Sequence, residues 1–364
     1  MSHNDTLPAE DAEESPAAVH PTDLRPAAVR GLHGSTVALS IVVLALVLAP
    51  WVVDSVTLGV LNSIGLAGLG ALALNLLTGF AGQVSIGNAA LMLVGSFTAG
   101  LLGATAELPF VLVLSCSLVV GAVTGLLIGA PAVRLRGLYL VIATLAFHYI
   151  ALFVGLKVQD AAVGSVGFVM PFPSVGTWTL DSDIKWSYVI WAINGAVLLV
   201  VARLLSGKFG RAWIMIRDAE VSAQSAGVGV SGYKLLVFAL SSAIISLQGA
   251  LFAYYYGSAQ VGSFNLDVAL QYIAMIIIGG LGTLSGSYIG AVFVLGLPYV
   301  LQLWLTGPVE SLFGFGAMRD IQNIIYGLAL VGFLLLQPKG MYAIFARLSN
   351  RVTGSRRAPT RSNS

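Results

Sequence analysis

The run PFVLVLSCSLVVGAVTGLLIGA extends from residue 109 to residue 130 without one charged side chain. A helix needs about 20 mostly apolar residues to cross the hydrocarbon core of a bilayer. A strand of a membrane barrel would need only about 10 residues, with alternating character. Because lipid offers no hydrogen bonds, the backbone of such a run must bond internally, which predicts a membrane-spanning helix.

The composition of the whole chain agrees with this prediction. Of its 364 residues, 57% are hydrophobic and 9% are charged, whereas an average soluble domain has about 25% charged residues. So few charges cannot cover a water-exposed surface, which argues against a disordered chain, a nucleic-acid-binding protein and an ordinary cytosolic enzyme. We predict an all-α polytopic membrane protein with about ten transmembrane helices, at residues 36–53, 57–78, 86–105, 109–130, 138–156, 187–206, 234–256, 268–284, 287–305 and 320–337.

Basic residues in the loops predict the orientation of these helices. If the N-terminus is cytoplasmic, all of the 18 Lys and Arg residues except Lys157, Lys185 and Arg319 fall on the cytoplasmic side. Cytoplasmic loops carry an excess of Lys and Arg. The pattern therefore predicts that both termini are cytoplasmic, with one long hydrophilic loop outside (157–186) and one inside (207–233).

The two ends of the chain differ from its centre. Residues 1–34 are polar, without the apolar stretch of a signal peptide, and they predict a disordered cytoplasmic tail. Residues 341–364 predict a basic cytoplasmic tail. The transmembrane domain is expected between them, at residues 35–340.

Residues suited to catalysis or metal binding are scarce. Cys116 is the single cysteine, so an internal disulfide and a cysteine-based metal site are excluded. His148 is the one histidine outside the N-terminal tail, and it is either a functional ionisable group in the membrane or a neutral side chain bonded to a neighbouring helix. We predict no catalytic residue and no metal site.

The sequence lacks two features that particular classes of transporter need. No Asp or Glu lies in mid-span, whereas ion-driven carriers usually use buried carboxylates as relays. A phosphate-binding loop ends in Gly-Lys followed by Ser or Thr, and none of the five lysines is followed by either residue. If ATP drives this protein, another chain hydrolyses it.

The inner loop contains the sequence GKFGRAWIMIRDAEVSAQSAG, residues 207–227. Its apolar positions recur at helical spacing, and Gly227 stands where such a helix would stop. One interpretation is an amphipathic helix resting on lipid. The other is a docking helix for a cytoplasmic partner, in which charged residues set the register. The face consists of Trp213, Ile216, Ala219 and Ala223, and the charged residues are Arg211, Arg217, Asp218 and Glu220.

Glycines gather in two other segments. Gly82 and Gly87 lie beside Gln83 and Ser85, and a second glycine-rich segment surrounds Thr283 and Ser285. Glycine permits close packing of helices. It also permits unwound backbone at membrane depth, which occurs only where the backbone lines a cavity or is buried in protein. In the second case the small polar side chains could bond a passing zwitterion.

Several stretches together resemble one family, the membrane permease subunits of branched-chain amino acid ABC importers, LivM type. GRAWIMIRDAEVSAQSAGV (210–228) looks like the coupling loop of that family, although Glu220-Val-Ser-Ala replaces the Glu-Ala-Ala core of the generic importer loop. The similarity covers about residues 60–342. It extends to LNLLTGFAGQVSIGNAA (74–90), RGLYLVIATLAF (136–147), YKLLVFALS (233–241), QGAL (248–251), IGGLGTLSGSYIGA (278–291), YGL (326–328) and QPKGM (337–341).

The resemblance implies a multi-pass permease subunit in a bacterial plasma (inner) membrane. Its implied partners are a sister permease, two ATPase subunits and an extracytoplasmic substrate-binding protein, with ATP and Mg²⁺ bound by the ATPases and no cofactor on this chain. No nucleic-acid partner is expected. The implied ATPase-coupling residues are Arg211, Trp213, Ile216, Arg217, Asp218, Glu220, Ala223 and Gly227. The candidate substrate path follows instead from the glycine-rich segments themselves, and it includes Gly82, Gln83, Ser85, Gly87, Thr283 and Ser285.

Two alternative functions stay open. A permease of the same family could carry urea, short amides or another small solute instead of branched-chain amino acids. An ion-coupled secondary carrier is the other alternative, although it would want carboxylates in mid-membrane and would not need the 207–233 loop.

Overall fold

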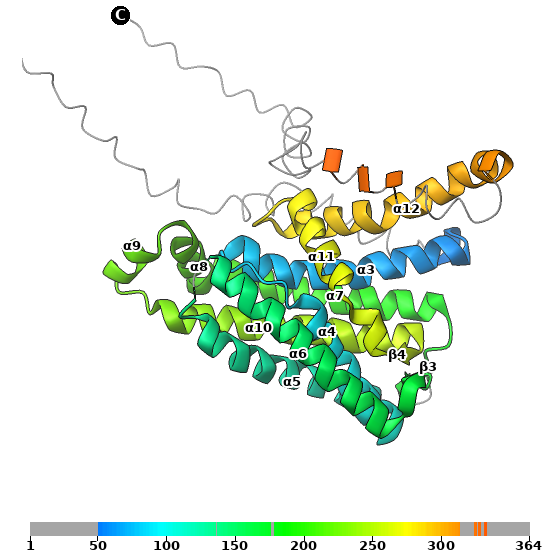
Figure 1. Ribbon diagram of the computed structural model, residues 1–364, viewed down its shortest axis with the longest axis horizontal. Helices are drawn as coiled ribbons and strands as arrows, with labels where there is room; N and C mark the ends of the chain where they lie inside the picture. The colour runs from blue at the N-terminus through cyan, green and yellow to red at the C-terminus, as the bar shows by residue number, and fades with distance from the viewer. Residues whose placement is uncertain are drawn as a thin grey trace, which may run out of the picture.

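The computed structural model describes residues 50–135, 137–175 and 178–313, together with residues 324, 325, 327, 328, 331 and 332. Helices dominate these residues (Figure 1). In chain order they are α3 (Ser55–Asn75), η2 (Leu76–Phe80), α4 (Asn88–Ala99), η3 (Gly100–Thr105), α5 (Phe110–Ala132), α6 (Leu138–Ala162), η4 (Gly164–Val166), α7 (Asp183–Ser206), α8 (Lys208–Asp218), α9 (Glu220–Ser225), α10 (Val230–Tyr256), η5 (Val261–Phe264), α11 (Leu266–Gly279) and α12 (Leu284–Phe313).

The prediction of an all-α polytopic membrane protein is confirmed. Within the described residues, eight helices are long and apolar enough to cross a membrane, and they correspond to the second to ninth predicted spans. The first and tenth predicted spans (36–53 and 320–337) fall largely outside the described residues, as do the two predicted tails (1–34 and 341–364).

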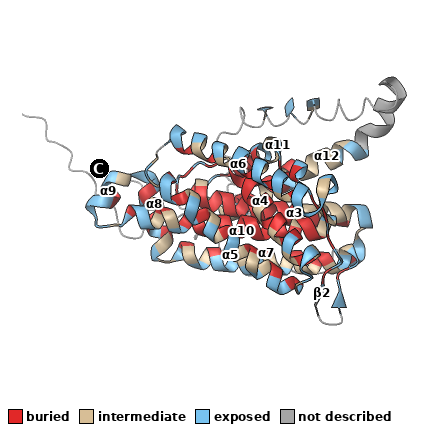
Figure 2. Cartoon of the chain, turned by 60° about the horizontal axis from the view of Figure 1, so that its bottom comes forward, coloured by how far each residue is buried: buried red, intermediate tan, exposed pale blue. Residues whose placement is uncertain are grey.

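Three helices form the centre of the bundle. In α3 and its continuation η2, 83% of an apolar 18-residue stretch is buried inside the bundle, and the corresponding shares in α10 and α4 are 72% and 67%. The corresponding share in α6 and in α7 is only 22%. Figure 2 shows the buried residues concentrated in α3, α4 and α10. The peripheral helices expose large apolar side chains, as expected for surfaces that face lipid.

Small residues allow the central helices to approach closely. A Cβ atom added at Gly95 of α4 would overlap the carbonyl group of Ser246 in α10, and one added at Gly249 of α10 would overlap the carbonyl group of Met92 in α4. The two backbones are therefore in direct contact. This is the small-residue packing that replaces the hydrophobic effect between helices in lipid.

The bundle has two distinct ends. The α8 end carries α8 and α9, and the opposite end, the β1 end, carries four short strands (Figure 1). The strands are β1 (Phe168–Val169), β2 (Ser174–Val175), β3 (Trp178–Thr179) and β4 (Ser258–Ala259). β1 pairs antiparallel with β4, with Phe168 opposite Ala259, and β2 pairs antiparallel with β3, with Ser174 opposite Thr179.

The described basic residues sort between these ends as the loop charges predicted. Lys157 and Lys185 lie toward the β1 end. The other described basic residues lie at or near the α8 end, and they are Arg134, Arg203, Lys208, Arg211, Arg217 and Lys234. Which end faces the cytoplasm stays a prediction.

Some predicted boundaries were wrong. The loop predicted at 157–186 is shorter, because α6 continues to Ala162 and α7 begins at Asp183. The span predicted at 268–284 ends at Gly279, where the next residue, Gly280, has a φ of 122°. A positive φ is readily adopted only by glycine, so the glycine pair ends the helix before the polar residues are reached.

Candidate functional site

The inner loop forms two helices and not the single helix that was expected. α8 ends at Asp218, Ala219 is extended (φ −156°, ψ 90°), and α9 begins at Glu220. α9 ends at Ser225, and Gly227 follows with a φ of 80°. The prediction that Gly227 stops the helix is therefore confirmed.

The apolar face of this loop is buried against the chain itself. Trp213, Ile216 and Ala223 are each less than 5% exposed, and Nε1 of Trp213 donates a hydrogen bond to the carbonyl oxygen of Tyr233 (3.0 Å). Ile216 and Ala223 pack with Val230 at the start of α10. The expectation that this face enters a partner's groove was therefore wrong, because α10 already covers it. Ala219, predicted on the same face, is exposed.

The outward side of α8 and α9 mixes polar and apolar residues. Arg211 and Asp218 are exposed there, and so is Val221, whose side chain is 69% exposed. Glu220 instead turns inward and forms a 2.9 Å ion pair with Lys234 of α10. The side chains of this pair are only 22% and 9% exposed, so it fastens α9 to α10 away from bulk water.

Arg217 connects α8 to the transmembrane helices. Its Nη1 donates a hydrogen bond to the carbonyl oxygen of Gly79 in η2 (2.8 Å), and its Nε pairs with Asp218 (2.9 Å). Gly82, with a φ of 70°, lies directly against it, since a Cβ there would be 2.8 Å from Cγ of Arg217. A Cβ added at Gly282 would lie 3.1 Å from Nη1. The two glycine-rich segments thus meet at one arginine.

Asn75 holds the same two segments together from inside the bundle. Its Oδ1 accepts a hydrogen bond from the backbone N–H of Gly282 (2.9 Å). Its Nδ2 donates to the carbonyl oxygen of Thr283 (2.8 Å) and to Oγ of Ser287 (2.9 Å). Asn75 is fully buried, so these bonds satisfy a polar group that would otherwise be costly to bury. We call Asn75, Gly79, Gly82, Arg217 and Gly282 the inner node.

The residues predicted to line a substrate path lie around the inner node. Gln83 and Ser85 are buried, and Nε2 of Gln83 lies 3.4 Å from the carbonyl oxygen of Lys234. Ser85 Oγ accepts a hydrogen bond from the backbone N–H of Gly87 (3.2 Å). Thr283 is half-buried and Ser285 is exposed. Gln83 and Ser85 face the interior of this subunit, so they can meet a solute only after a rearrangement.

Sequence reasoning missed two residues of this region. Asn75 is a polar residue inside an apolar span, and this contrast could have identified it as a residue that needs hydrogen-bond partners. Lys234 was counted only as a loop charge, although it begins an apolar span, where a buried cation needs a partner. Only the folded chain identifies Glu220 as that partner.

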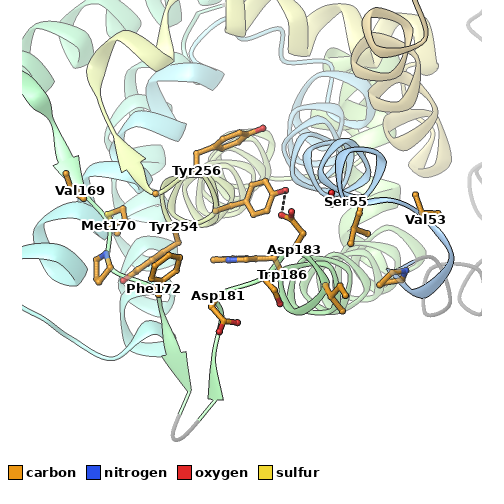
Figure 3. Close-up of a pocket in the computed structure, with 17 residues that line it drawn as sticks. Val53, Ser55, Val169, Met170, Phe172, Asp181, Asp183, Trp186, Tyr254 and Tyr256 are labelled. Atoms are coloured by element: carbon orange, nitrogen blue, oxygen red, sulfur yellow. Dashed lines mark hydrogen bonds between the residues drawn. The ribbon is translucent and has the colours of Figure 1, made fainter. Parts of the chain in front are cut away.

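A hollow of about 790 Å³ lies at the β1 end, between the start of α7, the end of α10 and the segment around β1. Figure 3 shows Asp183 and Trp186 of α7 beside Tyr254 and Tyr256 of α10, with Phe172 and Met170 near Tyr254, and its dashed line marks the hydrogen bond that Asp183 accepts from the Tyr255 hydroxyl group. Asp181 also borders it. The Asp181 carboxylate accepts a hydrogen bond from Lys185 (2.6 Å), which lowers the pKa of this carboxyl group.

The other candidate residues have modest roles. His148 is fully buried in α6, and none of the described residues forms a hydrogen bond with either ring nitrogen. Its ring makes an edge contact with Tyr149, with a centroid distance of 5.6 Å. Cys116 is half-buried as a free thiol in α5. Within the described part of the chain, no group of His, Cys, Asp and Glu is arranged to hold a metal ion.

The sequence of this chain is similar to those of known transport proteins. Residues 56–334 match the family described as the permease component of branched-chain amino acid transport systems. The chain is 28% identical to the high-affinity branched-chain amino acid permease LivM of Salmonella typhimurium and 29% identical to that of Escherichia coli, in each case over 72% of this chain and 68% of the relative. It is also 28% identical to the autoinducer 2 import system permease LsrC of Klebsiella pneumoniae, over 57% of this chain and 63% of the relative. No solved structure gives a significant match.

Proposed function

Since the chain belongs to the family of permease components of branched-chain amino acid transport systems, we propose that it is the membrane subunit of an ATP-driven importer for these amino acids. Together with a sister permease it would form the translocation path. ATP and Mg²⁺ would be bound by two ATPase subunits, and this chain would be neither an enzyme nor a holder of a cofactor. An extracytoplasmic binding protein would deliver the solute.

The inner node is the observation that carries this proposal. Arg217 sits at the end of α8, and its hydrogen bond reaches the backbone of η2, which continues the most buried helix of the bundle. A force applied to α8 and α9 from outside is therefore passed to α3 through a short, charge-assisted contact. Such an arrangement suits a subunit that is moved by a partner.

The outward surface of α8 and α9 is the proposed seat of the ATPase. It offers an exposed apolar side chain, Val221, between the exposed polar and charged residues Asp218 and Ser225. Interfaces commonly combine such an apolar centre with a polar rim. In this proposal Trp213, Ile216 and Ala223 shape the surface from beneath, while Arg211 and Asp218 set its register from the rim.

Access to the solute would alternate between the two ends of the bundle. Closure of the ATPases would move α8 and α9, and Arg217 would pull η2 relative to the turn at Gly282. Gln83, Ser85 and Thr283 surround this turn and would become accessible from the path in one of the two states. The α8 end is cytoplasmic in this proposal, which places both termini in the cytoplasm and the chain in a bacterial plasma membrane.

Two alternatives differ in the solute or the driving force. The similarity to the autoinducer 2 permease supports a permease of the same family with another small solute, such as urea or a short amide. An ion-coupled carrier has less support, because the described Asp and Glu residues lie in loops or near the ends of helices. Transport that requires ATPase subunits would separate the importer from the carrier.

The proposal is tested by changing Val221 on the outward surface of α9. We expect Val221→Asp to reduce the amount of copurifying ATPase at least tenfold, because a carboxylate would be desolvated at the centre of the interface. Val169→Asp is the matched control, since Val169 is 71% exposed but lies at the β1 end. Quantifying the ATPase in affinity-purified complexes from the native membrane gives the readout.

Equal ATPase content in both variants and in the native complex would contradict the proposed docking surface. Solute uptake that persists when the ATPase subunits are deleted would contradict the importer itself. The two outcomes are separate, because the first concerns the surface and the second concerns the energy source.

A further inference from the structure

The hollow at the β1 end has the chemistry of a site for an ammonium group. Its wall combines rings with carboxylates: Trp186, Tyr254, Tyr255 and Tyr256 come with Asp181 and Asp183. Aromatic faces attract cations through their ring quadrupole, and a carboxylate beside them adds a direct charge partner. Apolar residues, among them Met170 and Leu58, complete the lining. The site is thus suited to a small molecule that carries both an ammonium group and an apolar part.

The two carboxylates of the hollow differ in their partners. Asp181 is already paired with Lys185 at 2.6 Å. Asp183 accepts a hydrogen bond from the hydroxyl group of Tyr255 (3.1 Å), and no described Lys or Arg forms an ion pair with it. Its negative charge therefore remains available to a cation in the hollow.

Asp183 is also held in place. Its backbone carbonyl oxygen accepts a hydrogen bond from Nδ2 of Asn62 in α3 (3.0 Å), and the Tyr255 contact comes from α10. Trp186 is fixed by edge contacts with Phe110 and Tyr255, with centroid distances of 6.1 and 5.6 Å. Because binding does not have to order these groups, little of the affinity is lost to immobilising them.

We propose that this hollow is a binding site for the ammonium group of an apolar primary amine, an apolar α-amino acid being the physiological case. Asp183 is the charge partner, the rings of Trp186 and Tyr255 surround the ammonium group, and the apolar part of the solute lies toward Met170. The site deepens the proposed function, on which it rests. It favours amino compounds over urea and short amides, because a neutral amide leaves the charge of Asp183 unpaired.

The test uses the full-length chain in lipid nanodiscs, without ATP. The probes are L-leucine, 3-methylbutylamine and 4-methylpentanoate, which share a branched chain but differ in their charged groups. Binding is followed by tryptophan fluorescence, and the Trp186→Phe variant identifies the part of the signal that comes from the hollow, since the chain has six tryptophans. We expect saturable changes with the first two probes and none with the third, which has no amine.

Asp183→Asn removes the charge but keeps an oxygen that accepts from Tyr255. We expect this variant to bind both amines at least tenfold more weakly, with an unchanged melting temperature. The matched control is Asp160→Asn, which removes an exposed carboxylate near the end of α6, at the same end of the bundle but outside the lining of the hollow, and we expect its affinity to stay within twofold of the native value.

Three outcomes would overturn the proposal: equal binding of 4-methylpentanoate, native affinity in Asp183→Asn, or the absence of any amine binding to the native chain. If the amines do not bind but Asp183→Asn weakens docking of the binding protein, the hollow is a socket for that protein instead. None of these results depends on the ATPase, so a failure here is distinct from a failure of the Val221 test.

Discussion

Arg217 joins three segments that are far apart in the sequence. Its guanidinium group bonds to the carbonyl oxygen of Gly79, pairs with Asp218 and lies close to Gly282. Glycine is needed at Gly79 because a Cβ atom there would overlap the Oδ1 atom of Asn75. The contact is possible only because several residues without side chains leave room for one long cation.

We expect Arg217→Ala to uncouple ATP hydrolysis from transport. A hydrogen bond from a charged donor contributes about 1.5–3 kcal/mol, and the 37% exposure of this side chain places Arg217 at the low end of that range. Since about 1.4 kcal/mol corresponds to a factor of ten, uptake per ATP hydrolysed should fall about tenfold. The measurement compares solute uptake with phosphate release in proteoliposomes.

The control for this prediction is Arg211→Ala, which removes an exposed arginine from the same helix. It should lower the uptake per ATP less than Arg217→Ala does. Both variants should keep their ATPase subunits, and a loss of ATPase from Arg217→Ala would mean that this residue acts as a docking contact.

At the scale of elements, α8, α9 and the start of α10 form one packed unit. Trp213, Ile216 and Ala223 are buried against residues of the 228–233 segment. The break at Ala219 starts α9 in a new direction and places Glu220, in its first turn, against Lys234. We expect this unit to move as one body, which the proposed coupling role requires.

We expect Glu220→Gln to loosen this unit. The substitution leaves Lys234, whose side chain is only 9% exposed, without its charge partner, at a cost of roughly 1–3 kcal/mol. Amide hydrogen exchange of residues 220–228 should therefore become faster. Adding Lys234→Met should restore slow exchange, because it removes the unpaired charge.

Asp218→Asn is the comparison, since the Arg217–Asp218 pair is exposed to water and contributes little to stability. If Asp218→Asn accelerates the amide hydrogen exchange of residues 220–228 as much as Glu220→Gln does, the buried Glu220–Lys234 pair has no special role in holding α9.

At the scale of the whole molecule, a buried central layer separates two ends with different chemistry. The α8 end carries most of the described basic residues, and the β1 end carries Asp54, Asp181 and Asp183 beside aromatic rings. Hydrogen bonds of Asp54 with Thr57, and of Asp181 with Lys185, lower the pKa of these two carboxyl groups.

This asymmetry predicts the orientation of the protein in the membrane. In a Cys116→Ser background, a cysteine at Ser174 at the β1 end should react with an impermeant maleimide added to intact cells. A cysteine at Ser225, exposed at the α8 end, should react only after the membrane is opened. Labelling of Ser225→Cys in intact cells would reverse the proposed orientation.

Much of the architecture was determined by the sequence alone, because lipid imposes a simple rule. Long uncharged runs must become helices, so the second to ninth predicted spans are found with shifts of only a few residues at most ends. The sorting of basic residues between the two ends follows from the same reasoning about loops. Gly227 ends α9 as predicted, since a local left-handed backbone needs no tertiary contact to favour glycine.

Only the tertiary structure decided which partners the polar and small residues take. The apolar periodicity of the inner loop predicted a buried face, but periodicity cannot say whether α10 or another protein covers it. The partners of Asn75 and Lys234 were equally out of reach of the sequence. Asn75 bonds to Ser287, which is 212 positions away, and Lys234 pairs with Glu220, which is 14 positions away. Hydropathy is a property of each segment, whereas the inner node and the hollow around Asp183 arise where the ends of several helices meet, and that meeting depends on side-chain packing between distant segments.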